Sequence, residues 1–135
     1  MGVIAHYADC IVVTHDNKIL LQQRPEEGVH PGALCAFGGH IEDGEKVIQA
    51  LIRELHEELG AVANPDEMIF LGEIAEDDGS VVHIHFWHDK NATITGCYEW
   101  EARRYDTVSE ALSHPKIMQY TKWALLECKQ RGLIV

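Results

Sequence analysis

Apolar and polar positions follow two different periods along the chain, and the changes of period predict the order of its elements. Apolar runs typical of strands cover Ala8 to His15 and Lys18 to Arg24, and Asp16-Asn17 between them predicts a hairpin turn. The segment from Ala33 to Ile41 also reads as extended, but Gly38-Gly39 is expected to break it.

A second hairpin is expected in the middle of the chain. Met68 to Glu76 and Ser80 to His88 are rich in strand-forming residues, and Asp77-Asp78-Gly79 between them is a strong turn signal. Within Ser80 to His88 the histidines at 83 and 85 fall on one face. We expect a polar, cleft-facing strand side there, in preference to a two-histidine metal site. A further extended segment is expected within Ile94 to Tyr105.

Helical periodicity appears between the two hairpins. Glu45 to Leu59 carries apolar residues three and four positions apart, which predicts an amphipathic helix. Asp43 or Gly44 is expected to cap its start and Gly60 to end it. The apolar stripe consists of Val47, Ile48, Leu51, Ile52, Leu55 and Leu59.

Two more helices are expected near the C-terminus, a short one over Val108 to Leu112 and an amphipathic one over Lys116 to Arg131. The inward stripe of the second is expected to run through Ile117, Tyr120, Ala124 and Cys128. Strands, a helix, strands and then helices predict an α+β fold with a mixed sheet packed against helices. A length of 135 residues suggests one domain, spanning residues 1–135.

Composition narrows the class of function. The net charge of −11 argues against binding nucleic-acid polymers, which depends on Lys and Arg contacts to phosphate. The chain has no apolar run approaching the ~18 residues of a membrane span and no signal-peptide pattern, so we expect a cytoplasmic protein without membrane contact. The four cysteines are too far apart in sequence for a CxxC site and are expected to stay reduced.

The carboxylates of the first helix carry the clearest chemical signal. Glu54, Glu57 and Glu58 have the spacing that places side chains on one side of a helix. Like charges at this spacing repel by roughly 0.2–0.5 kcal/mol per pair, so a positive partner is expected. Three carboxylates suit a hard divalent cation, with Mg²⁺ favoured and Mn²⁺ a plausible substitute.

The surrounding sequence matches a longer pattern, G-x5-E-x7-R-E-U-x-E-E-x-G-U, where U is a bulky apolar residue. Its fixed positions fall on Gly39, Glu45, Arg53, Glu54, Leu55, Glu57, Glu58, Gly60 and Ala61. This segment resembles the Nudix box of hydrolases that cleave nucleoside diphosphates linked to another moiety. The resemblance implies an α/β/α sandwich around a mixed sheet. It also implies Mg-dependent hydrolysis of a diphosphate linkage.

The resemblance further implies roles for individual residues. Glu54 is the first choice for general base, with Glu57 as a further catalytic residue and Arg53 orienting a catalytic glutamate. The metal ligands would be the side chains of Glu54, Glu57 and Glu58 with the Gly38 carbonyl. Arg24 and Gly39 would contact substrate. Which of the glutamates is the base is left open.

Residues outside the pattern leave several alternatives open. Glu99 or Glu101 would supply a further carboxylate, and alternation places both on one strand face. Trp100 and Trp123 are expected to pack structurally, and Trp87 to pack in the core or on the surface. The sequence does not identify the oligomeric state, monomer or homodimer.

The short chain favours a MutT-like nucleoside triphosphate pyrophosphohydrolase acting on a small-molecule nucleotide. Two alternatives are a nucleotide-sugar or ADP-ribose type pyrophosphatase, and a non-catalytic module that senses nucleotides. All box glutamates are present, which favours an enzyme.

Overall fold

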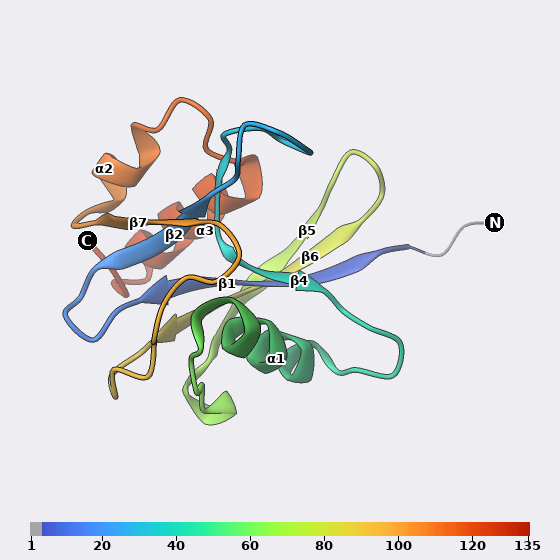
Figure 1. Cartoon of the computed structure of the whole chain (residues 1–135), viewed down its shortest axis with the longest axis horizontal. Helices are drawn as coiled ribbons and strands as arrows, with labels where there is room; N and C mark the ends of the chain where they lie inside the picture. Colours follow the sequence, from blue (N-terminus) through green and yellow to red (C-terminus); the bar gives the residue numbers. More distant parts are fainter. Residues whose placement is uncertain (1–3) are drawn as a thin grey trace.

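The computed structural model describes residues 4–135, which form one mixed sheet with helices on both faces (Figure 1). The strands are β1 (His6–Val13), β2 (Ile19–Gln23), β3 (Leu34–Cys35), β4 (Phe37–His40), β5 (Ile69–Ala75), β6 (Val81–His88) and β7 (Glu101–Tyr105). The helices are α1 (Val47–Leu59), α2 (Val108–Leu112) and α3 (Gln119–Gln130), with a 3₁₀ turn at Pro65–Glu67. This arrangement confirms the predicted α+β sandwich.

The sheet is mixed because β1 pairs in parallel with β6, whereas the other strand pairs are antiparallel. Both predicted hairpins are confirmed, with Val12 opposite Leu20 in the first and Ile74 opposite Val82 in the second. Along one edge, β1 changes partner, from β4 at Tyr7–Cys10 to β2 at Val12–Val13. This exchange brings the ends of β2 and β4 to the same region of the sheet.

Two apolar clusters lie on the two faces of the sheet, as strand alternation requires. On one face, Leu51, Leu55 and Leu59 of α1 pack against Cys10 and Val12 of β1. On the other, the helices α2 and α3 cover Ile11, Leu21, Ile84 and Phe86, with Leu125 buried among them. Figure 1 shows α1 on one side of the sheet and α2 and α3 on the other.

Several element boundaries differ from prediction. The helix α1 begins at Val47 and not Glu45, and the residue at its N-terminal cap is Lys46, whose N–H donates to Gln49 Oε1 at 2.8 Å. Neither Asp43 nor Gly44 caps it. The C-terminal end is as expected, because Gly60 takes the left-handed conformation with φ 66°.

The segment after the first hairpin was predicted to break at Gly38-Gly39, and this was wrong. The break falls between Cys35 and Phe37, and β4 runs through both glycines. The segment Ile94 to Tyr105 is extended as a strand only from Glu101. The helix α3 begins at Gln119, so Ile117 lies outside it, in an isolated bridge with Leu34.

Candidate active site at the junction of β4 and α1

The two glycines of β4 allow close approach by two different elements, β1 at Gly38 and α1 at Gly39. A Cβ at Gly38 would lie 2.0 Å from the carbonyl oxygen of Ala8, and one at Gly39 would lie 2.5 Å from Glu54 Oε1. Both distances are far below van der Waals contact, so neither position accepts a larger residue without movement. The carboxylate of Glu54 therefore rests directly on the backbone of β4.

Arg53 holds the charged side of α1 in place. Its Nε and Nη2 donate to the two oxygens of Glu45 at 2.9 Å each, and its Nη2 also donates to the His40 carbonyl at 3.1 Å. Its Nη1 donates to Glu54 Oε1 at 2.8 Å and lies 3.5 Å from Glu57 Oε2. Arg53 therefore contacts three glutamates, Glu45, Glu54 and Glu57.

The hydrogen bonds of Arg53 shift the pKa values of the groups that it pairs. Its hydrogen bonds, with a further one from the Glu42 N–H, lower the pKa of Glu45 to about 2. The same pairing raises the pKa of Arg53 further above its ordinary range. Because one planar guanidinium spans Glu45 and Glu54, the Glu54 carboxylate is fixed in direction as well as in position.

Glu58 is buried, although it belongs to the same acidic cluster. Only 2% of the residue is exposed. The Gly38 N–H donates to Glu58 Oε1 at 3.2 Å, and Gln22 Nε2 donates to Glu58 Oε2 at 3.2 Å. Burial, followed by the charges of Glu99 and Glu54, raises the pKa of Glu58 far above its ordinary value. No salt bridge to Glu58 occurs within residues 4–135, so this carboxylate lacks a protein counter-charge.

The expected convergence of the three glutamates is therefore only partly observed. Glu54 and Glu58 both face β4, whereas the Glu57 side chain is 56% exposed beside Arg53. The helical spacing correctly placed all three on neighbouring positions of the helix surface. Their different contacts with β4 and Arg53 separate their carboxylates.

The structure distinguishes Glu99 from Glu101. Glu99 lines the cleft, and burial followed by the charge of Glu54 raises its pKa. Glu101 is exposed and forms an ion pair with Arg103. The prediction that both share one strand face was wrong, because β7 begins only at Glu101 and Glu99 lies in the bend before it.

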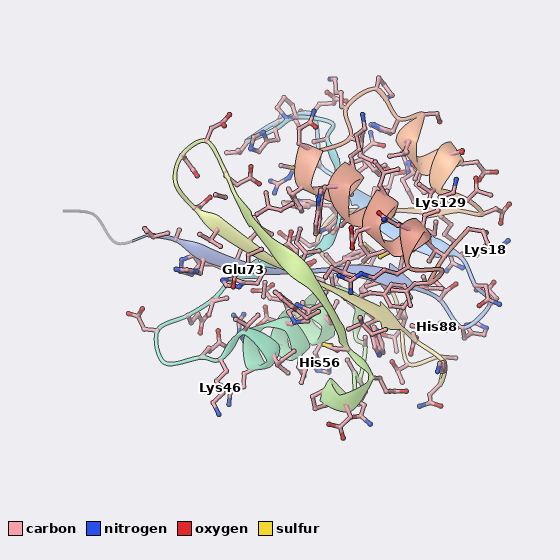
Figure 2. All side chains as sticks on the ribbon, turned by 180° about the vertical axis from the view of Figure 1, so that it is seen from behind. Lys18, Lys46, His56, Glu73, His88 and Lys129 are labelled. Atoms are coloured by element: carbon pink, nitrogen blue, oxygen red, sulfur yellow. The ribbon has the colours of Figure 1, made fainter. Side chains whose placement is uncertain are left out.

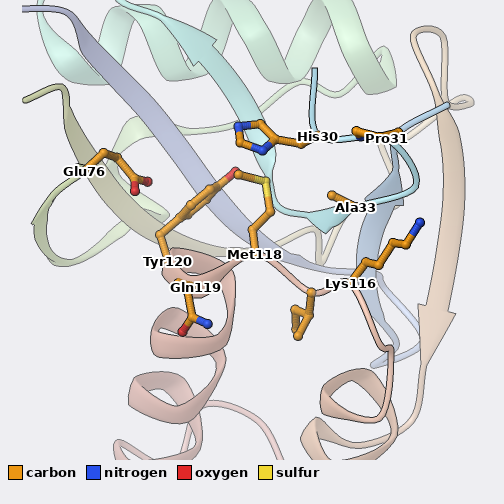
Figure 3. A pocket seen from close by; sticks show the side chains of 9 residues that line it. His30, Pro31, Ala33, Glu76, Lys116, Met118, Gln119 and Tyr120 are labelled. Atoms are coloured by element: carbon orange, nitrogen blue, oxygen red, sulfur yellow. The ribbon is translucent and has the colours of Figure 1, made fainter. Parts of the chain in front are cut away.

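A cleft of about 730 Å³ opens beside these carboxylates. It is lined by residues from β1, β2, β4 and α1 and by the turn between β5 and β6, including Asp9, Gln22, Arg24, Gly38, Gly39, Glu54, Asp77, Glu99, Trp100 and Tyr120. A second hollow of about 380 Å³ adjoins it and shares His30, Glu76, Met118 and Tyr120 (Figure 3). The volume of the larger cleft falls within the range of small-molecule sites.

Arg24 and Trp100 form one wall of the cleft. The guanidinium carbon of Arg24 lies 4.4 Å from the centroid of the Trp100 ring, a cation–π contact. Arg24 therefore lies at the cleft, as expected for a substrate contact. Trp100 packs against Arg24, and it also lines the cleft. Only a structural packing role was expected for it.

The histidine pair of β6 does not face the cleft, which corrects a further prediction. The cleft is lined by Val82 from the opposite face of β6. His83 instead contacts His6 at 2.9 Å between ring nitrogens and Glu73 at 3.3 Å, the latter labelled in Figure 2. His85 is buried, which lowers its pKa, and Trp87 packs in the core as one of the two expected alternatives.

Sequence reasoning missed two polar residues of the cleft. Asp9 is 7% exposed, and burial raises its pKa to about 7 against an opposing hydrogen bond from Tyr120. Gln22 is 2% exposed and contacts Glu58. A polar residue within an apolar strand run was the available signal in both cases, because such residues are buried only when something pairs with them.

The oxygen donors beside the cleft suit a divalent cation that also binds substrate. Within residues 4–135, no three His, Cys, Asp or Glu side chains are grouped so that they could hold a metal ion by themselves. Mg²⁺ does not need such a cage, because it keeps several waters and binds one or two carboxylates together with substrate phosphates. Glu54 and Glu58 supply oxygen donors beside a cleft, and Glu58 lacks a counter-charge, so the residues fit such a cation.

Comparison with known proteins agrees with the fold and the site. The NUDIX domain model matches residues 5–125. The CTP pyrophosphohydrolase of Escherichia coli K12 is 37% identical over 106 residues, 77% of this chain and 77% of that protein. The nucleoside triphosphatase NudI of Shigella flexneri is 40% identical over 52 residues, 38% of this chain and 37% of that protein.

Solved structures show the same fold. The solution structure of the E. coli ORF135 protein is 30% identical with a TM-score of 0.68, covering 95% of this chain and 89% of that one. A MutT structure from work on Aliivibrio salmonicida and Vibrio cholerae has a TM-score of 0.72 over 95% of this chain and 99% of that one, at 19% identity. The fold and site thus define a hydrolase of phosphoanhydride bonds. The chain belongs to the Nudix family, whose members generally use divalent metals and act on small nucleotides.

No helix within residues 4–135 is long and apolar enough to cross a membrane. All four cysteines are free thiols, as expected.

Proposed function

We propose that this chain is a Mg²⁺-dependent nucleoside triphosphate pyrophosphohydrolase, with Mn²⁺ as a possible substitute. The observation that carries the proposal is the burial of Glu58 without a counter-charge, where it accepts hydrogen bonds from Gly38 and Gln22, two residues that line the cleft. Burying an ionised carboxylate costs on the order of several kcal/mol, unless a cation or hydrogen bonds compensate for the lost hydration. A divalent cation with its phosphate ligand supplies that compensation.

The residues of α1 and β4 would hold such a cation. We assign Glu54 and Glu58 as carboxylate ligands with the Gly38 carbonyl. Glu57 is the further ligand, because its exposed side chain contacts only Arg53 among the described residues. When bound, the metal neutralises phosphate charge and lowers the pKa of a water molecule.

Glu54 is the proposed general base. Its carboxylate is fixed by Arg53 and by contact with Gly39, so it can accept a proton from a water molecule without first rotating. Arg53 acts through Glu54 and Glu45 and is therefore a positioning residue. Glu99, at the same cleft, adds a further carboxylate, whose pKa is raised by burial and then by the charge of Glu54.

The other walls of the cleft bind the nucleotide. Arg24 provides a positive charge for the phosphates or a contact for the nucleoside, and Gly39, which lines the cleft, is the proposed backbone contact with substrate. The relative from E. coli named as a CTP pyrophosphohydrolase makes CTP the first substrate to test.

The test is a panel of ribonucleoside and deoxyribonucleoside triphosphates, with ADP-ribose and a nucleotide sugar, incubated with Mg²⁺. Pyrophosphate and phosphate release are followed with and without chelator. We expect chelator-sensitive pyrophosphate release from at least one triphosphate. Tight nucleotide binding without turnover on any member would contradict the enzyme proposal and favour a sensing module. Turnover of ADP-ribose alone would reassign the substrate class.

A further inference from the structure

Gln22 contacts Glu58 and lines the cleft, and neither substrate binding nor catalysis as proposed above uses it. It is the fourth residue of β2, in the run ILLQQ, and it is 2% exposed. Alternation along β2 places it on the same face as Leu20, which packs in the α1 cluster. Gln22 also lines the cleft. A large polar side chain is therefore buried beside α1 with one edge toward the substrate space.

Two contacts fix the orientation of its carboxamide. Gln22 Nε2 donates to the Ala36 carbonyl and to Glu58 Oε2, each at 3.2 Å. The nitrogen of an amide donates two hydrogen bonds, and its oxygen donates none. Turning the group over would place its oxygen against the carbonyl oxygen of Ala36, so the two acceptors determine which end is nitrogen. The oxygen must occupy the opposite end.

That oxygen, Gln22 Oε1, is buried and has no hydrogen-bond partner within residues 4–135. Buried polar atoms in native proteins are almost always paired, and an unpaired one costs on the order of 1–3 kcal/mol. A folded chain keeps such an acceptor where a ligand provides the missing donor. Because Gln22 lines the cleft, a molecule bound there can supply the missing donor.

The chemistry of the donor can be narrowed further. Phosphate groups at neutral pH accept hydrogen bonds, so the phosphate part of a nucleotide does not satisfy a carboxamide oxygen. The nearby cleft carboxylates of Asp9, Glu54 and Glu99 also favour a donor over an acceptor. The nucleoside carries two kinds of donor, the amino group of the base and the hydroxyls of the ribose.

We propose that Gln22 is a specificity-determining residue, whose Nε2 holds Glu58 while its Oε1 accepts a hydrogen bond from an amino group or ribose hydroxyl of the bound nucleoside. The inference rests on the proposed function. It links substrate recognition to the position of a metal ligand through one side chain. A nucleoside that lacks the donor leaves Oε1 unpaired, so it binds and reacts less well.

The experiment compares substrates that differ in the placement of the donor. CTP and ATP carry an amino group where UTP and ITP carry a carbonyl with a proton on the adjacent ring nitrogen, and each ribonucleotide differs from its 2′-deoxy counterpart by one hydroxyl. We expect the wild type to prefer the donor-bearing member of one kind of pair by roughly fivefold to tenfold in kcat/KM, the effect of one hydrogen bond. Gln22→Met, which is similar in size and lacks both polar atoms, should reduce that preference to about twofold or less.

Gln22→Glu separates the two functions of the side chain. It keeps an oxygen for the substrate but replaces the donor to Glu58, so kcat should fall on every substrate while the preference within the pairs is retained. Gln23→Met is the matched control, since Gln23 is the next residue of β2, on the opposite face, and does not line the cleft. It should leave all preferences unchanged.

The outcomes separate this inference from the proposed function. If the wild type hydrolyses no member of the panel, the proposed function fails. If it hydrolyses nucleotides but treats all pairs equally, or if Gln22→Met keeps the wild-type preference, the inference about Gln22 is overturned. If Gln22→Met does not unfold cooperatively, it is not properly folded and its kinetics are set aside. The inference is then judged from the wild-type preferences within the pairs and from Gln22→Glu. Loss of the preference in Gln22→Glu would also contradict the assignment.

Discussion

The helices α1 and α3 cover opposite faces of one sheet, yet they bury different chemistry. Leu51, Leu55 and Leu59 make α1 an ordinary packing helix, but it also buries Glu58 without a counter-charge. The polar residue that α3 buries completely is Thr121, whose hydroxyl accepts from the Ala36 N–H at 3.3 Å and completes the hydrogen bonding of the sheet. The difference indicates that α3 only packs against the sheet, whereas α1 also carries a site. A carboxylate is kept buried without a protein counter-charge where a bound cation can compensate for its charge.

The largest expected effect comes from Glu54. Glu54→Gln removes the proposed base and a metal ligand, so kcat should fall by roughly 100- to 10,000-fold. Glu127→Gln on α3 is the control, since Glu127 pairs with Arg131 four residues later and lies away from the cleft. Its kcat should stay within about twofold of wild type. Comparable losses in both variants would show that the acidic edge of α1 has no special role.

The two helices should respond alike where they only pack. Leu55 and Leu125 are both completely buried, and replacing either by alanine should lower the free energy of unfolding by about 2–5 kcal/mol. Urea unfolding of both variants measures this. The activity per folded molecule should be far less affected by Leu125→Ala than by Glu54→Gln. A neutral Leu125→Ala would show that α3 is poorly packed against the sheet.

Arg53 on α1 and Arg131, which caps the C-terminal end of α3, give a third comparison. Arg53 bridges Glu45, Glu54 and the His40 carbonyl, whereas Arg131 donates to the carbonyls of Phe70 and Leu71. Lysine keeps the charge but loses the planar fork. We expect Arg53→Lys to reduce kcat by about 10- to 100-fold, as for residues that orient metal ligands. Arg131→Lys should alter thermal stability alone, and a kcat loss there would weaken the contrast.

The smallest expected effect concerns acid. The pKa of Glu45 is lowered from 4.5 to about 2 by Arg53, so the folded state binds this proton less readily than the unfolded chain. The resulting stabilisation is present above about pH 4.5 and is lost as the pH falls toward 2. Urea unfolding of wild type and Glu45→Gln should differ at pH 6, and the difference should shrink below about pH 4.5 and vanish near pH 2. A difference that stays constant over this range would contradict the pairing. Glu127→Gln provides the baseline.

Much of the architecture could be predicted because local patterns agree with the fold. The two hairpins, α1 and α2 follow from apolar periodicity and turn residues, and Gly60 ended α1 as its freedom to adopt positive φ suggested. The boundaries were less predictable, since Ile117 has helical periodicity but pairs with Leu34 through the backbone. A contact between segments far apart in the sequence decided that boundary.

The site could be predicted only in part, because spacing along one element does not show how other elements pack against it. Spacing along one helix placed Arg53, Glu54, Glu57 and Glu58, but not the depth of each, which depends on how closely β4 approaches. Spacing also failed for Glu99 and Glu101, because alternation holds only within a strand and β7 begins at Glu101. Gln22 and Asp9 come from β2 and β1, and the partner exchange along β1 places β4, with Gly38 and Gly39, beside them.

The most direct test of the central claim is to locate a bound divalent cation on the protein. Mn²⁺ is paramagnetic, so amide signals close to it broaden when it is titrated into ¹⁵N-labelled protein with a nucleotide present. We predict that the signals of Gly38, Gly39 and Glu54 broaden first and that those at the C-terminal end of α3, around Glu127, are affected least. Equal broadening around Glu127 and the other surface carboxylates would contradict the assignment of the metal site to the junction of β4 and α1.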